Sequence, residues 1–314
     1  MIVTWKNSGF AAALLMLPLL LVHGTLAQVT GAKVFETPEM AVSALIDAAR
    51  NKEKDRILAV LGPEMEEWIL SGDEVQDEQG RKRFVAAYDQ KNRMEMPDEE
   101  TAILYVGEDD FPFPFPVVKL EDGWSFDAEE GKEELLDRRI GENELDAIQV
   151  VQAIADAQVE YSTIDWDEDG MLEYAPRFAS TEGNRDGLYW PAEGDAFESP
   201  LGPLVAEAAG EGYTADGSDE DATAPYHGYR YRLILRQGAD APGGAHDYEV
   251  NGNMIGGYAV LAYPARYNVS GIMTFMLNYS GTVYEADLGE GTETSALAIE
   301  AFNPDAKWKE VRPE

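Results

Sequence analysis

The residues best suited to chemistry form a short acidic run in the middle of the chain. Asp165, Asp167 and Asp169 stand at alternate positions, a glycine follows them, and Glu173 comes shortly after. Calcium takes about six to eight oxygen ligands in flexible geometry, so alternating carboxylates before a glycine can wrap around it. An EF-hand would need a bidentate glutamate at the twelfth loop position, where this chain has Pro176. The run therefore predicts either an irregular Ca²⁺ site or a solvated acidic turn.

A second group combines charge with aromatic rings. Arg185 and Asp186 stand just before Tyr189 and Trp190, a combination that could line a polar and aromatic pocket. Glu144 is a candidate general base if the fold buries it near this pocket. The structural alternative is an Arg–Asp pair that holds a loop over an aromatic core.

The usual residues of nucleophilic and metal-dependent hydrolysis are scarce. The chain has no Cys, and beyond residue 30 its only histidines are His227 and His246. Neither a G-x-S-x-G nor an H-E-x-x-H pattern occurs. His227 precedes a predicted strand that begins at Tyr229, and we treat both as candidate binding residues. The sequence predicts no catalytic residue and no cofactor other than a calcium ion.

The longest helical pattern in the chain lies upstream of these groups and would position them. Asn143 can cap a helix, and apolar residues then recur at spacings of three and four as far as Tyr161. Gly141 predicts a break or a kink between this helix and a shorter one over residues 133–140. Arg138 and Arg139, beside the break, are candidate binding residues that could anchor the joint between two domains through carboxylates.

Loops and strands are expected from Tyr161 to the end of the chain. One long helix followed by an antiparallel sheet predicts an α+β domain over residues 131–314. Residues 212–225 are acidic and rich in turn formers, which predicts a mobile surface loop. The strands are expected over residues 229–235, 255–263, 272–278 and 282–286.

A smaller α+β domain is expected over residues 33–130. Thr37 and Pro38 suit the first turn of a helix. Phenylalanine and proline alternate from Phe111 to Pro116, and proline cannot donate to a ladder, so this run predicts an extended arm or a sheet edge. Further helices are expected over residues 54–61 and 78–91, and strands over residues 101–106, 117–120 and 124–127. The fold class is therefore α+β, with N-terminal helices and a curved antiparallel sheet, then a long helix packed on an antiparallel sheet.

The charge of the chain excludes several partners. Sixty acidic residues against 24 basic ones leave a net charge of −36. Such a field repels phosphate backbones and anionic lipid surfaces, so we expect no nucleic-acid binding. Hydrophobic residues make up 45% of the chain, which is enough for a sizeable core.

The first 27 residues have the pattern of a secretory signal peptide. Lys6 is followed by an apolar run from Phe10 to Val22, and small residues then precede Gln28. An uncleaved membrane anchor is the alternative to a cleaved signal peptide, but the run is short for a membrane span, which needs about 20 residues. We therefore expect cleavage near Gln28, a periplasmic or secreted mature protein, and no stable membrane insertion after cleavage.

Six short motifs give the chain a family resemblance. Together they resemble the bacterial exported proteins of the domain of unknown function 2950 family, over roughly residues 35–311. The resemblance implies export and a shared fold, and it implies no activity. The motifs are RRIGENE at residues 138–144, DGLYWP at 186–191, SPLGP at 199–203, YHGY at 226–229, QG at 237–238 and APGGA at 241–245.

Two weaker similarities concern the halves of the chain. The first half is similar in element order to the cystatin-like cone of the nuclear transport factor 2 superfamily. The second half resembles the globular domain of pilins and pseudopilins, in which a helix leads into a sheet. A pilin carries its hydrophobic helix directly before that domain, whereas a whole domain intervenes here, which argues against filament assembly.

Two functions of different classes are compatible with these observations. The first is a non-enzymatic envelope protein that binds or assembles with another envelope protein. The second is a periplasmic enzyme or small-ligand receptor that uses a pocket in the N-terminal cone or around residues 185–190. A deep pocket with converging polar groups would favour the second function, and a flat aromatic surface would favour the first.

Overall fold

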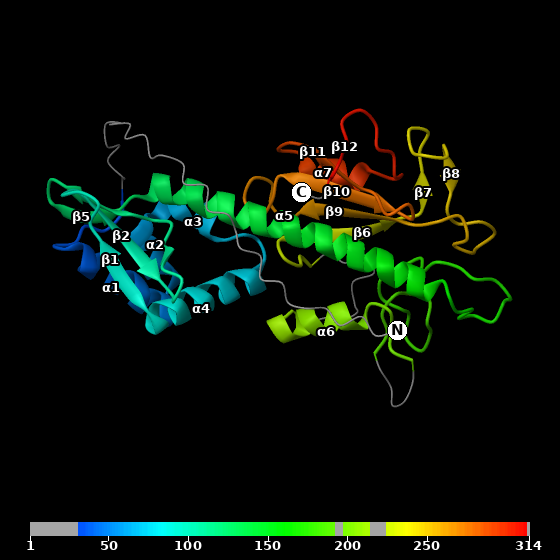
Figure 1. Ribbon diagram of the computed structural model, residues 1–314, viewed down its shortest axis with the longest axis horizontal. Helices are drawn as coiled ribbons and strands as arrows, with labels where there is room; N and C mark the ends of the chain where they lie inside the picture. Colours follow the sequence, from blue (N-terminus) through cyan, green and yellow to red (C-terminus); the bar gives the residue numbers. More distant parts are fainter. Residues whose placement is uncertain (1–30, 192–196, 214–223, 313–314) are drawn as a thin grey trace.

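The computed structural model describes residues 31–191, 197–213 and 224–312. These form two lobes, which one long helix, α5, connects (Figure 1). The N-terminal lobe comprises residues 31–127 and the first part of α5, and the C-terminal lobe comprises the remainder. Each lobe has its own cluster of buried apolar side chains. The expected α+β class is confirmed, while the domain division at residue 130 stays a prediction.

Helices make up the first part of the N-terminal lobe. The Thr37 side chain accepts a hydrogen bond from the Met40 backbone N–H at 3.3 Å, so it caps the first helix as predicted. The last helix begins earlier than expected because Asp73, rather than a later residue, caps it through the Gln76 N–H. The helices are α1 (Pro38–Arg50), α2 (Lys54–Leu61), the 3₁₀ turn η1 (Pro63–Met65), α3 (Glu66–Ile69) and α4 (Glu74–Gln90).

An antiparallel sheet in the order β1-β2-β4-β5 completes this lobe, with β3 also paired to β2. Only the start of the Phe-Pro run forms a strand, β3, and it lies at an edge of the sheet, as proline requires. The strand β1 was missing from the prediction. The strands are β1 (Asn92–Glu95), β2 (Thr101–Val106), β3 (Phe111–Pro112), β4 (Val117–Leu120) and β5 (Gly123–Phe126).

The connecting helix α5 (Ala128–Tyr161) is continuous, so the predicted break at Gly141 is wrong. Asp127 caps it by accepting a hydrogen bond from the Glu130 N–H. Asn143, the predicted cap, lies fully buried in the middle of the helix. Its side-chain amide donates to the Ser270 carbonyl at 2.8 Å and accepts from the Gln76 amide. A residue type that favours helix caps can therefore lie inside a helix, where it forms tertiary hydrogen bonds instead.

The C-terminal lobe is built on a sheet in the order β12-β11-β10-β9-β6. Helix α5 packs against β9 and β10. The four expected strands are present, but two helices in this half were not predicted. The elements are α6 (Gly202–Glu211), β6 (Tyr229–Ile234), β7 (Arg236–Gln237), β8 (His246–Asp247), β9 (Ala259–Pro264), β10 (Met273–Asn278), β11 (Val283–Asp287), α7 (Thr292–Ala298) and β12 (Lys309–Glu310).

Two of the sequence predictions concern residues outside the described ranges. They are the signal peptide over residues 1–27 and most of the acidic loop over residues 212–225. Within the described ranges, no helix combines the length and the apolar character that a membrane span requires.

Candidate functional site

A cavity of about 770 Å³ lies in the N-terminal lobe between α1, α2, α4, α5 and the Phe-Pro run. Its floor is apolar and well packed. Four of the floor residues are at most 6% exposed: Leu45, Leu61, Val106 and Phe115. They come from a helix pair, a central strand and the Phe-Pro run, so the cavity is assembled from segments far apart in the chain.

Helix α4 covers this cavity and packs loosely. None of its 17 residues is buried. Phe84 and Ala87 line the cavity and are half-buried. The Phe84 ring stacks on the Phe113 ring with centroids 4.6 Å apart, which ties α4 to the Phe-Pro run. The helix therefore forms a roof whose apolar side chains pack only partly against the core of the lobe.

Four arginines line the cavity, and two of them are neutralised by nearby carboxylates. Arg81 pairs with Glu78 at 2.6 Å, and Arg138 pairs with Glu134 on its own helix. Arg138 also donates to the Pro112 carbonyl and lies over the Phe111 ring. It therefore holds the Phe-Pro run against α5.

Arg139 is bound to carbonyl groups within the N-terminal lobe. Its guanidinium donates to the Trp68 and Ile69 carbonyls at 2.8 and 3.0 Å. Burial lowers the pKa of Arg139, while the charge of Asp77 opposes that effect. Arg138 and Arg139 thus bind groups inside one lobe, and the idea that they anchor the joint through carboxylates is wrong.

The junction between the lobes is polar, and His227 lies within it. Its Nδ1 lies 2.8 Å from Asp146 Oδ2 on α5, and its Nε2 lies 2.7 Å from Glu211 Oε2 at the end of α6. Burial lowers the pKa of His227, but the hydrogen bonds to these two carboxylates outweigh it and raise the pKa to about 9. His227 is therefore an imidazolium that joins two helices.

Asp73 links the N-terminus of α4 to the same junction. Its side chain is buried and accepts hydrogen bonds from the Tyr213 hydroxyl at 2.8 Å and the Gly228 N–H at 3.1 Å. The Gln79 side chain adds a bond to the Glu211 carbonyl at 2.7 Å. The roof of the cavity is thus anchored at one end to the C-terminal lobe.

Glu144 and Tyr229 serve the C-terminal sheet. One carboxylate oxygen of Glu144 accepts hydrogen bonds from the Ile272 and Met273 N–H groups at 3.0 and 2.9 Å, at the start of β10. Tyr229 is fully buried, and its hydroxyl donates to the Met273 carbonyl.

The Arg185 segment is closed on itself. The Arg185 guanidinium lies 5.2 Å and 5.5 Å from the ring centroids of Trp166 and Trp190. These rings therefore form cation–π contacts within the chain. Asp186 bonds Thr181 and lies 3.6 Å from the Arg177 guanidinium, so the expected pairing with Arg185 is wrong. Tyr189 forms a backbone bridge with Ala179.

Glu144 lies far from the Arg185 segment, although a general base there would have to be close. The Tyr161 hydroxyl at the end of α5 donates to the Arg185 carbonyl at 2.7 Å. Glu144 lies more than four helical turns before Tyr161 on α5. At 1.5 Å per residue this corresponds to roughly 25 Å. Glu144 and the Arg185 segment therefore belong to different parts of the molecule.

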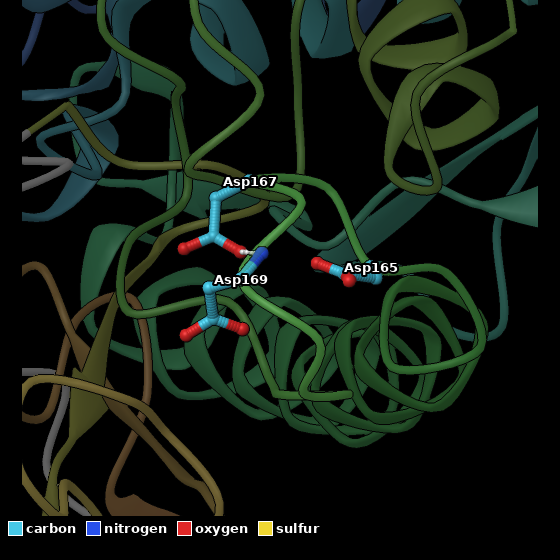
Figure 2. A group of neighbouring side chains, drawn as sticks. All are labelled: Asp165, Asp167 and Asp169. Carbon is cyan, nitrogen blue, oxygen red and sulfur yellow. Dashed lines mark hydrogen bonds between the residues drawn. The ribbon is translucent and has the colours of Figure 1, made fainter.

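The acidic run does bring three carboxylates together. One ligand atom from each of Asp165, Asp167 and Asp169 lies within 4.8 Å of the others. Figure 2 shows the three side chains on one loop, with the Asp169 N–H donating to Asp167. The carboxylate of Glu173 instead accepts a hydrogen bond from the Met254 N–H at 2.8 Å. Burial raises the pKa of Glu173, and the three aspartates add to that effect.

The sequence predicts a pocket in the N-terminal cone but not its lining residues. Phe84 and Phe113 could have indicated the lining of this pocket. One lies in a predicted helix and the other in the proline-rich arm, and both rings favour burial on an apolar surface. No sequence pattern indicates the roles of Asp73, Tyr213 and Glu211 at the junction, because each role depends on partners that are distant in the chain.

Comparison with known proteins identifies a family. No curated protein matches the chain, and no solved structure does. The pilin-like and cystatin-like character of the two halves therefore stays a prediction. A family model described as "Protein of unknown function (DUF2950)" matches residues 32–311. The chain belongs to this DUF2950 family.

Proposed function

We propose that this chain is an exported, non-enzymatic binding protein that holds a small apolar molecule in the cavity of its N-terminal lobe. The observation that carries the proposal is the roof of that cavity. Helix α4 covers about 770 Å³ of space, and its side chains are at most partly buried. Most helices in proteins are stabilised by packing of an apolar face. A ligand beneath α4 would supply that packing.

Gly80 supports the same proposal. It lies in the middle of α4, lines the cavity, and has no positive φ that would require glycine. Glycine inside a helix costs about 1 kcal/mol relative to alanine. An added Cβ would meet only the end of the flexible Arg83 side chain, at 4.0 Å. The missing side chain leaves room in the cavity at a cost in stability, which is common at binding sites.

The size and lining of the cavity suit a small molecule. Ligand pockets are typically about 300–1,000 Å³ and mostly apolar, with a few polar groups. Transfer of apolar surface out of water contributes about 25 cal/mol per Å². A ligand lying against Phe84, Phe113 and Phe115 would be held chiefly by this effect.

A non-enzymatic role agrees with the chemistry of His227. A general base near neutral pH needs a free nitrogen lone pair. Both ring nitrogens of His227 contact carboxylates, which favours the charged form, and the pKa is raised to about 9. We therefore assign His227 a structural role at the junction.

Export is part of the proposal and has its own test. Its support is the signal pattern over residues 1–27. Mass spectrometry of the envelope fraction should find a mature N-terminus at or near Gln28. A cytoplasmic protein that retains Met1 would contradict export.

Assembly with an envelope protein is the second candidate function, and one surface favours it. Met171, Leu172 and Ile255 are 40%, 58% and 45% exposed. They lie near one another, because Tyr174 N–H bonds the Met254 carbonyl and the Asn253 amide contacts the Met171 sulfur. Leu172→Glu with Ile255→Glu should abolish cross-linking to a partner in the native envelope. Unchanged cross-linking would remove this surface from consideration.

Binding in the cavity is tested with Nile red, an uncharged dye that fluoresces in apolar surroundings. The full chain should enhance its fluorescence. Ala87→Trp would place a large ring in the cavity from the roof and should greatly reduce the enhancement. Ala86→Trp is the matched control, because Ala86 is the exposed neighbour on the same helix. Equal binding by both variants would contradict the proposed function.

A further inference from the structure

The charges around the cavity differ with depth. Its exposed rim carries Arg83 with the carboxylates of Glu108, Asp109 and Glu142. Below the rim, the half-buried charges are three arginines and Asp77. Water screens charges at the rim far more than charges below it. Two of these arginines form ion pairs with carboxylates, so within the part of the chain that the structure describes Arg139 is the inner cation that remains without an ion pair.

Arg139 is the inner cation whose charge is least compensated. Arg81 and Arg138 each have a carboxylate within ion-pair distance. Among the described residues, no ion pair involves Arg139, which donates only to two carbonyl oxygens. Both oxygens of the nearby Asp77 instead accept from the Ser71 N–H at 3.1 Å. Asp77 acts on Arg139 through its charge without a direct ion pair. A half-buried guanidinium that forms no ion pair favours an incoming anion, because charge-assisted hydrogen bonds are strong where water is scarce.

Arg83 and Arg139 approach the same part of the cavity. The Gln76 amide on α4 bonds the Asn143 amide on α5, which fixes where these helices meet. Gly80 and Arg139 each lie four residues, about one helical turn, from that contact and line the cavity. The Arg83 guanidinium folds back over Gly80, since Nη2 lies 4.0 Å from the position of an added Cβ.

We propose that the cavity takes an amphipathic carboxylate, with its apolar part against Phe84, Phe113 and Phe115 and its carboxylate between Arg83 and Arg139. This inference rests on the proposed function and adds the chemical class of the ligand. A carboxylate matches the planar fork of a guanidinium, so two arginines can hold one headgroup. The floor of the cavity is apolar and would exclude the charged end, which sets the orientation of the ligand.

Competition against Nile red tests the chemical class of the ligand. The three competitors have the same ten-carbon chain and differ in the headgroup. Decanoate, decanol and decyltrimethylammonium are each titrated below their micelle concentrations. Decanoate should displace the dye about tenfold more tightly than decanol, as expected for one charge-assisted interaction. The cationic compound should be the weakest. Equal displacement by all three would overturn the carboxylate assignment and leave the apolar cavity intact. Absence of dye binding to the full chain would instead contradict the proposed function.

Substitutions test the two arginines. Arg139→Gln and Arg83→Gln should each lower the affinity for decanoate severalfold and leave the affinity for decanol unchanged. Arg56→Gln is the control for net charge, because Arg56 lies outside the cavity and pairs with Glu53 on the surface. Equal losses in Arg139→Gln and Arg56→Gln would show a general charge effect and overturn the proposed headgroup site. Thermal unfolding of each variant separates a lost site from a lost fold.

Discussion

The two lobes use their apolar residues in opposite ways. In the C-terminal lobe, every residue of β9 is buried, and large rings such as Phe275 and Phe302 are at most 1% exposed. In the N-terminal lobe, a helix of 17 residues buries none and lies over a cavity of about 770 Å³. Protein interiors are normally as dense as organic crystals. The contrast teaches that the C-terminal lobe provides a rigid body, whereas the N-terminal lobe keeps space that its own side chains do not fill.

A pair of phenylalanine truncations would sharpen this contrast most strongly. Phe275→Ala should lower the free energy of unfolding by about 3–5 kcal/mol, the usual cost of deleting a buried ring. Phe84→Ala in the roof should cost only about 1–2 kcal/mol, because that ring is only half-buried against the core. Urea denaturation of both variants measures the difference. Equal costs would mean that α4 packs as tightly as the core.

The junction between the lobes should respond to pH through His227. The pKa of His227 in the folded protein, about 9, lies above its ordinary value of about 6.5. The protonated form is therefore favoured by folding. Its contribution to stability is fully present below pH ~6.5 and is lost as the pH rises through about 9. We expect a loss of about 2–3 kcal/mol over this range, given a shift of this size in a partly exposed group.

The control for this prediction is His227→Gln, measured by denaturation at several pH values. The variant should be less stable than the natural chain at pH 6 and should lack the decline between pH 7 and 9. An unchanged decline in the variant would assign the pH dependence to other groups.

Calcium should have the smallest effect. We propose that Asp165, Asp167 and Asp169 bind Ca²⁺ weakly, since one carboxylate oxygen of each lies within 4.8 Å of the others. A ligand that binds only the folded state adds about 1.4 kcal/mol at a tenfold excess over its dissociation constant. The melting temperature should therefore rise in millimolar Ca²⁺, and less in Mg²⁺, at fixed ionic strength. An equal response from the double variant Asp167→Asn with Asp169→Asn would leave the loop as a solvated acidic turn.

Local signals in the sequence were sufficient for α1 and α2, but not for β1, α6 and α7. Thr37 caps α1, and Lys54–Leu61 is a helix with the predicted bounds, ending at the C-cap Gly62. Residues that begin or end a helix act on their neighbours in the chain. Asn143 misled the prediction because capping preference is local, whereas its amide in the structure bonds Ser270 and Gln76, which are distant in the chain. Tertiary partners overrode the local preference.

The candidate site depends still more on distant partners. The cavity exists because α1, α4 and α5 meet the Phe-Pro run at particular angles, and no spacing along the chain encodes that arrangement. Arg139 could be named from the sequence as a binding residue, but its partners, the Trp68 and Ile69 carbonyls, could not. Residue type can thus indicate a candidate, while the space around it comes only from the fold.

The central claim is that α4 leaves room for a ligand, and Gly80→Leu tests it most directly. The added side chain should occupy part of the cavity beneath α4 and improve helix propensity by about 1 kcal/mol, so the melting temperature should rise. Affinity for Nile red should fall at least tenfold, while Ala86→Leu on the exposed side of α4 should leave it unchanged. A Gly80→Leu protein that is stabilised and still binds the dye as tightly as the natural chain would contradict the account.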